Sequence, residues 1–115
     1  MGYSVYGGQK PEKYYQEKWC DAHSGRMEVV LKDKTRCDCL TLTHAVEVDF
    51  AKKWAEAIGQ SLNYAMQTGR KAGILIIYKT YQDKKKIIKL KEIIKGFRLP
   101  IDLWIIKAEQ NDHSF

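Results

Sequence analysis

The segment that most constrains the fold is AVEVDF, residues 45–50, because polar and apolar side chains alternate along it. A period of two predicts a β-strand. It places Glu47 and Asp49 on one face, with the valine and phenylalanine side chains on the other. Carboxylates beside an apolar interior are costly unless a cation neutralises them. Because hard divalent cations prefer oxygen ligands, the acidic pair predicts a metal site.

The preceding run, TRCDCL at residues 35–40, is predicted to be a second short strand. Alternation places Asp38 on the face opposite to Cys37 and Cys39. Asp38 is therefore a third candidate metal ligand, although a solvated strand face is the plainer alternative for any one of these acids. Zinc is disfavoured, because CxC lacks the paired ligand spacing of structural zinc sites and alternate strand cysteines are often buried.

Residues 51–68 have the clearest helical period in the chain, and Gly69 is a natural end for the helix. An apolar stripe at three- and four-residue steps predicts the buried face, which comprises Ala51, Trp54, Ala55, Ile58, Leu62 and Ala65. A second stripe is polar and comprises Lys53, Glu56, Gln60 and Tyr64.

The other patterns complete an α-β-β-β-α-β-α-β order. Helices are predicted at 11–22 and 81–97, and strands at 26–33, 72–79 and 101–107. In the helix at 81–97, Ile87, Leu90, Ile94 and Phe97 are expected to face inward. Hairpin-connected early strands and helix-connected later strands predict an α/β fold, with a mixed central sheet and helices on both faces.

The chain of 115 residues is predicted to be one domain, residues 1–115, with a loose arm at 1–9 and a polar tail at 108–115. No apolar run approaches the length of a membrane span, and a secretory signal pattern is not seen, so no membrane contact is expected. Three cysteines, an odd number, argue against a disulfide framework and for a reducing, cytoplasmic location. The formal net charge of +6 is compatible with a polyanionic partner.

Taken in order, these features resemble the PD-(D/E)XK nuclease superfamily. The resemblance rests on Asp38 in the second strand, on Glu47-Val48-Asp49 in the third, and on Gln60 and Tyr64, which match the QxxxY motif of the helicase-associated exonuclease branch. Glu17, in the first helix, occupies the place where members often carry an extra acidic ligand. The resemblance covers residues 11–79 and implies a restriction-endonuclease-like αβββαβ core with an additional C-terminal helix and strand.

One position departs from the pattern of the superfamily. Its usual third motif residue is lysine, whereas this chain has Asp49. Some members tolerate an acidic residue there, and others move the lysine to the next helix, for which Lys53 is the candidate here.

The resemblance implies a metal-dependent deoxyribonuclease. Asp38, Glu47 and a backbone carbonyl near Val48 would hold Mg²⁺ or Mn²⁺, with Glu17 as an extra ligand, and Asp49 or Lys53 would orient the attacking water. Gln60 and Tyr64 would hydrogen-bond the scissile phosphate or the ligand shell. DNA phosphates would contact the cationic side chains of Lys79, Lys84, Lys85 and Lys86, unless these form only a solvated helix face.

The small size of the chain favours structure-specific cleavage of branched or duplex DNA, as in the Holliday junction resolvases, which work as homodimers. The QxxxY motif points instead toward exonuclease relatives. A different class of function stays open, namely a non-catalytic nucleic-acid-binding or assembly module with a vestigial nuclease site.

Overall fold

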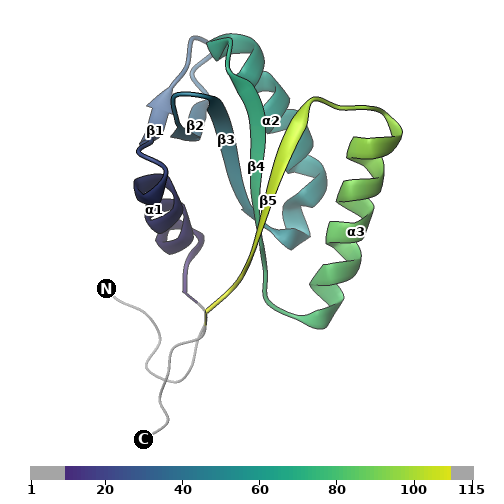
Figure 1. Cartoon of the computed structure of the whole chain (residues 1–115). Helices are drawn as coiled ribbons and strands as arrows, with labels where there is room; N and C mark the ends of the chain where they lie inside the picture. Colours follow the sequence, from purple (N-terminus) through teal and green to yellow (C-terminus); the bar gives the residue numbers. More distant parts are fainter. Residues whose placement is uncertain (1–9, 110–115) are drawn as a thin grey trace, which may run out of the picture.

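The computed structural model describes residues 10–109, which form three α-helices and five strands (Figure 1). The helices are α1 (Glu12–Ala22), α2 (Trp54–Thr68), which follows the 3₁₀ turn η1 (Ala51–Lys53), and α3 (Tyr81–Gly96). The strands are β1 (Arg26–Val30), β2 (Arg36–Leu40), β3 (His44–Phe50), β4 (Lys71–Tyr78) and β5 (Ile101–Lys107). This order confirms the predicted succession of elements. The arm predicted at residues 1–9 lies outside the described part of the chain.

The five strands form one mixed sheet in the order β1-β2-β3-β4-β5. The two hairpins pair β1 with β2 and β2 with β3 in antiparallel fashion. The crossovers through α2 and α3 make β3, β4 and β5 parallel. The α/β fold with a mixed central sheet is therefore confirmed.

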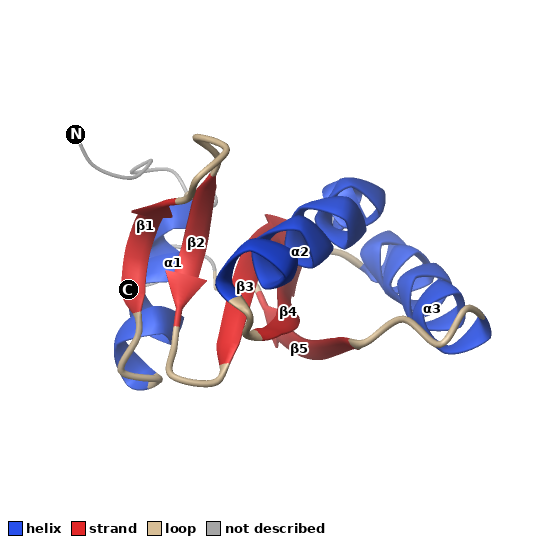
Figure 2. Cartoon of the chain, turned by 90° about the horizontal axis from the view of Figure 1, so that it is seen from above, coloured by secondary structure: helices blue, strands red, loops and turns tan. Residues whose placement is uncertain are grey.

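Helices cover both faces of this sheet, because the central strands are apolar on both sides. β4 is buried from Ala72 to Ile77. Ile74 and Ile76 pack in a cluster that includes residues of α2 and α3, whereas Leu75 and Ile77 pack in a second cluster with residues of α1. Figure 2 shows α2 and α3 side by side, with α1 against β1 and β2.

Two details of the predicted apolar faces are wrong. Phe97 is 74% exposed, because α3 ends at Gly96 and the chain turns before Phe97 could continue the buried stripe. Ala55 is exposed, while Ala57 of the same helix is fully buried. Trp54, predicted on the buried face, is partly buried and packs against the core, as do Trp19 and Trp104.

A disulfide joins Cys20 of α1 to Cys39 of β2, with 5.7 Å between the Cα atoms. The expectation that the chain has no disulfide is therefore wrong, and the odd cysteine is Cys37, which is buried and free. The number of cysteines does not determine whether two of them pair, because pairing depends on how α1 packs across β2. Gly25 belongs to the same contact, since a Cβ atom there would lie 2.5 Å from Cys39 Sγ and 2.7 Å from Cys20 Sγ.

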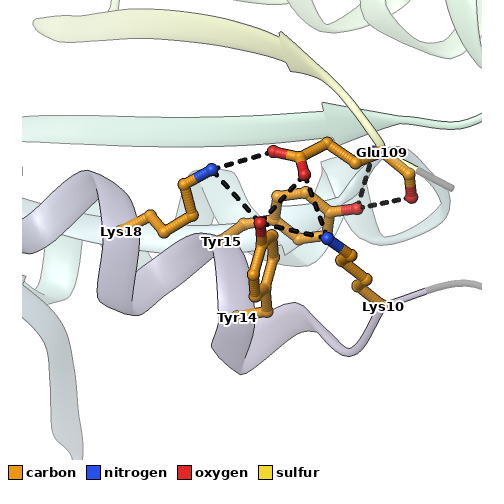
Figure 3. A network of polar contacts seen from close by, with 5 residues as sticks. All are labelled: Lys10, Tyr14, Tyr15, Lys18 and Glu109. Carbon is orange, nitrogen blue, oxygen red and sulfur yellow. Dashed lines mark hydrogen bonds and ion pairs between the residues drawn. The ribbon is translucent and has the colours of Figure 1, made fainter. Parts of the chain in front are cut away.

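Ala108 and Glu109, the first two residues of the predicted polar tail, contact β4 and α1. Ala108 N–H donates to the Tyr78 carbonyl at 2.7 Å. The Tyr15 hydroxyl accepts from Glu109 N–H and donates to its carbonyl (Figure 3). The Glu109 carboxylate also accepts from Lys10 and Lys18 at 3.1 and 3.0 Å. Within residues 10–109, none of the helices is both long enough and apolar enough to cross a membrane.

Candidate functional site

The site is built where β2 and β3 separate. The two strands pair at Cys39 with Val46 and at Leu40 with Ala45. At the next step the Asp38 carboxylate, rather than a backbone carbonyl, accepts the N–H of Val48 at 2.7 Å. This side-chain bond satisfies a backbone donor that the separating strand would leave unpaired. It also places Asp38 beside the acidic half of β3.

β1 and β2 are kinked at the same level. Glu28 has a left-handed backbone conformation, with φ of 55°. Met27 and Cys39, on one side of the kink, pack in the cluster with α1, whereas Val29 and Cys37 pack with Tyr64. The prediction that Cys37 and Cys39 share a face is wrong, because strict alternation assumes an unbroken pleat.

Gln16 of α1 secures this kink from the interior. Its side chain is 3% exposed. Its Nε2 donates to the Asp38 carbonyl at 2.8 Å and to Glu28 Oε2 at 2.7 Å. The amide therefore joins the backbone of a candidate ligand to a second carboxylate.

Glu47 and Asp49 are buried carboxylates, with 6% and 4% of their surface exposed. Glu47 Oε1 and Asp49 Oδ2 are buried atoms without a hydrogen-bond partner in the described part of the chain. Desolvation raises the pKa of Glu47 to about 11 and raises the pKa of Asp49. Desolvation also raises the pKa of Asp38 to about 6, although the Val48 N–H opposes that shift. Three acids are thus held where ionisation is unfavourable without a cation.

The α1 acid that joins this group is Glu12, in place of Glu17. Desolvation and then the negative charges of Asp49 and Asp38 raise the pKa of Glu12 to about 7. Glu17 is exposed. The reason is helical geometry: Glu12 lies four residues before Gln16 and shares its face, whereas Glu17 lies off that face.

Lys53 is the cation beside the acids. Its charge lowers the pKa of both Glu12 and Asp49, in opposition to the desolvation of these groups. Its side chain is exposed and comes from η1, between β3 and α2. Lys53 thus acts on these acids from the turn that precedes α2.

The two residues of the QxxxY pattern differ in burial. Tyr64 is 3% exposed and packs with Cys37 and Ala45. Desolvation and then the negative charge of Glu47 raise its pKa. Gln60 is exposed on the same helix. Tyr64 thus lies inside the protein beside Glu47, on the side of the predicted ligand shell rather than at an exposed position.

The predicted phosphate-binding lysines do not all line the same part of the surface. Lys79, Lys84 and Lys86 line two hollows at the C-terminal ends of the parallel strands. Lys85 is exposed on α3 and is not among the residues that line them.

The donor chemistry fits Mg²⁺ or Mn²⁺, because every candidate side-chain ligand is a carboxylate and two buried carboxylate oxygens have no partner. The ligands are not drawn together: among residues 10–109, no group of three His, Cys, Asp or Glu side chains has a geometry that holds a metal ion. The fit therefore lies in the chemistry of the donors and in their unsatisfied oxygens.

Glu12, Gln16 and Glu28 are the site residues that sequence reasoning missed. The i, i+4 spacing of Glu12 and Gln16 was a readable signal, while the kink at Glu28 had none. Comparisons of the chain with protein-family models, curated proteins and solved structures found no match.

Proposed function

We propose that this protein is a metal-dependent deoxyribonuclease that hydrolyses DNA phosphodiester bonds. One observation carries the proposal: among the described residues, the buried carboxylates Glu47 and Asp49 have oxygens without hydrogen-bond partners, beside Asp38 and Glu12. Such a group needs a cation to ionise. A basic chain with an acidic metal site suits a phosphodiester substrate, since the remaining surface attracts the polyanion.

We also propose the restriction-endonuclease-like arrangement for this fold. Its support is the order α1-β1-β2-β3-α2-β4, together with the place of Asp38 in β2 and of Glu47 and Asp49 in β3. Lys53, in the turn after β3, supplies the lysine that the third motif position lacks.

Each residue has a defined part in the reaction. Asp38 and Glu47 would hold Mg²⁺ or Mn²⁺ with a carbonyl near Val48, and Glu12 would take the part expected of Glu17. When bound, the metal polarises the phosphodiester and lowers the pKa of a bound water. Asp49 and Lys53 orient the attacking water at the phosphorus. The water oxygen would form a new bond to phosphorus and lose a proton to solvent, while the bond from phosphorus to the leaving oxygen breaks and that oxygen takes up a proton from solvent.

The second candidate is a non-catalytic nucleic-acid-binding module with a vestigial site. Its support is that, within residues 10–109, the same acids do not form a group of three ligands that could hold a metal ion. The two functions differ in one measurable respect, which is whether Glu47 is needed for cleavage.

The deciding experiment incubates the protein with labelled four-way-junction, flap, single-stranded and linear duplex DNA in Mg²⁺ or Mn²⁺. We expect cleavage, and a loss of at least about 100-fold in Glu47→Ala, because removal of a metal ligand costs affinity and activity. Glu17→Ala is the matched control and should cleave as the unaltered protein does. If no substrate is cut and DNA binding is the same in Glu47→Ala, the binding module is the correct function.

The same assay tests the proposed substrate structure and assembly. A resolvase cuts two symmetric strands, for which a two-fold homodimer supplies two sites. Paired symmetric nicks in the junction would support that assignment. Progressive loss of nucleotides from an end would support the exonuclease relationship of the Gln60 and Tyr64 pattern instead.

A further inference from the structure

Lysines and aromatic rings alternate at the C-terminal ends of the three parallel strands. β3 ends at Phe50, β4 at Tyr78 and β5 at Lys107, and α3 begins at Tyr81. We name this surface the basic rim and define it by the side chains of Lys52, Lys79, Lys84, Lys86 and Lys107, with the rings of Phe50, Tyr78 and Tyr81.

The basic rim contains two adjoining hollows that share Lys79 and Thr80. One hollow, of about 170 Å³, lies between Phe50 and Lys86. The other, of about 230 Å³, lies between Tyr78 and Lys107. Because Lys79 and Thr80 line both, the two hollows are neighbours on this surface.

Cations of the basic rim lie over its rings. Lys79 Nζ is 4.4 Å from the centre of the Phe50 ring. Lys84 Nζ is 5.6 Å from the Tyr78 ring centre and 6.0 Å from that of Tyr81. Tyr81 is 73% exposed, so its ring is accessible to a ligand. A ligand that offers both phosphate charge and a flat apolar face would match this arrangement.

The one carboxylate in these hollows does not cancel their positive charge toward a ligand. Asp83 Oδ2 accepts from the N–H groups of Lys79 and Thr80 at 2.7 and 3.2 Å, as the cap of α3. Asp83 Oδ1 lies 3.6 Å from Lys86 Nζ. The remaining lysines of the basic rim face the hollows with a net positive charge.

The basic rim adjoins the acidic site through η1. Lys52 lines the first hollow, while the next residue, Lys53, acts on Asp49 and Glu12. Phe50 likewise directly follows Asp49. The basic rim and the acidic site are therefore connected through the backbone of β3 and η1.

We propose that the basic rim binds an unpaired DNA strand and leads it toward the acidic site. Stacking requires free base faces, which a single strand offers and the interior of a duplex does not. The direction toward the acids rests on the proposed nuclease function, whereas the binding of the strand does not. The substrate class that follows is DNA with a single-stranded segment next to the cleaved bond.

The test measures binding without metal, in EDTA, by fluorescence anisotropy of a labelled oligothymidine of about 20 nucleotides, with a duplex of equal length. We expect the single strand to bind at least about tenfold more tightly than the duplex. Tyr81→Ala should weaken single-strand binding by about 5- to 150-fold, the range for loss of one stacking contact. Lys79→Gln should weaken it by at least about fivefold, because it removes a positive charge that lines both hollows. Lys85→Gln removes an equal charge from a neighbouring site outside the hollows and should change binding less than about twofold.

Two outcomes would overturn the proposal. One is equal or tighter binding of the duplex. The other is equal weakening by Lys85→Gln and Lys79→Gln, which would mean attraction by charge alone. Circular dichroism melting of Tyr81→Ala verifies that the variant is folded. Because the assay needs no cleavage, an inactive protein that passes it would refute the nuclease function and leave the basic rim as a binding surface.

Discussion

Glu47 and Asp49 are the residues whose energetics define the site. Each is a carboxylate in a place where charge is unfavourable, since desolvation raises the pKa of both. The nearest balancing charge is Lys53, whose exposed side chain offsets this effect only at Asp49 and Glu12. Buried acids arranged in this way are typical of sites that bind a cation.

At the same scale, Gln16 acts on the site without being a ligand. We predict that Gln16→Leu weakens Mn²⁺ binding by about 10- to 100-fold, the usual effect of losing a group that orients a ligand. The substitution removes the two hydrogen bonds that Gln16 Nε2 donates, to the Asp38 carbonyl and to Glu28. The backbone of Asp38 therefore loses the contact that fixes it to α1. Calorimetric titration with Mn²⁺ measures the change.

The matched control for this prediction is Gln82→Leu, because Gln82 is exposed on α3. It should bind Mn²⁺ as the unaltered protein does. A lower melting temperature of Gln16→Leu with unchanged Mn²⁺ affinity would mean that Gln16 serves stability alone.

Among the elements, α1 has the most varied connections. Its first turn brings Glu12 to the acids, its second brings Gln16 to the kink of β1 and β2, and its last residues carry the disulfide to β2. The rigid attachment of this helix is therefore a condition for the geometry of the site.

We predict that loss of the Cys20–Cys39 disulfide lowers the free energy of unfolding by about 3 kcal/mol, as expected for a closed loop of this length. The two cysteines are 19 residues apart. Thermal melts with and without dithiothreitol measure the loss in the unaltered protein. The double variant Cys20→Ser, Cys39→Ser should melt at the lower temperature under both conditions.

Cys37 provides the internal control, since it is free and buried. Burial raises the pKa of its thiol to about 11, so it stays protonated and unreactive at neutral pH. Cys37→Ala should therefore keep the response to dithiothreitol. An equal melting temperature with and without reductant in the unaltered protein would contradict the disulfide.

For the whole molecule, the raised pKa values predict how stability depends on pH. In the folded protein the pKa of Glu12 is about 7 and that of Asp38 about 6, against ordinary values of 4.5 and 3.8. At pH values between the ordinary pKa of each group and its pKa in the folded protein, the folded state binds more protons than the unfolded state. The free energy of unfolding therefore falls as pH rises. The metal-free protein should thus melt at a higher temperature at pH 5 than at pH 8.

Mg²⁺ or Mn²⁺ should reverse this loss at pH 8, because a metal binds the ionised carboxylates of the folded state. The gain is about 2.7 kcal/mol when free metal is about 100 times its Kd. Melting in EDTA and in Mn²⁺ at both pH values measures the effect, and Asp38→Asn should reduce both the pH dependence and the gain. Equal melting temperatures in all four conditions would refute the metal site.

The comparison starts at pH 5 because other carboxylates act in the opposite direction at lower pH. Hydrogen bonds from Lys18, Tyr14 and Lys10 hold the pKa of Glu109 at about 2. The stability that this group contributes is lost only as pH falls toward that value. The window from pH 5 to pH 8 therefore isolates the acids with raised pKa.

The order of the elements and the candidate acids Asp38, Glu47 and Asp49 could be read from the sequence, because both depend on periods of two and 3.6 residues that are local in the chain. The alternation in 45–50 placed Glu47 and Asp49 together, and the apolar run at 72–79 indicated a strand covered on both sides. Both features were determined by neighbouring residues, so no knowledge of the packing was needed.

Only the tertiary structure decided which distant residues meet. The docking angle of α1 selected Glu12 over Glu17 and paired Cys20 with Cys39. Beyond the kink at Glu28, Cys37 packs beside Tyr64. At the C-terminal ends of the parallel strands, Lys84 lines a hollow and Lys85 does not. These choices depend on how elements pack against one another, and a helical or strand period carries no information about the partner that each face will meet.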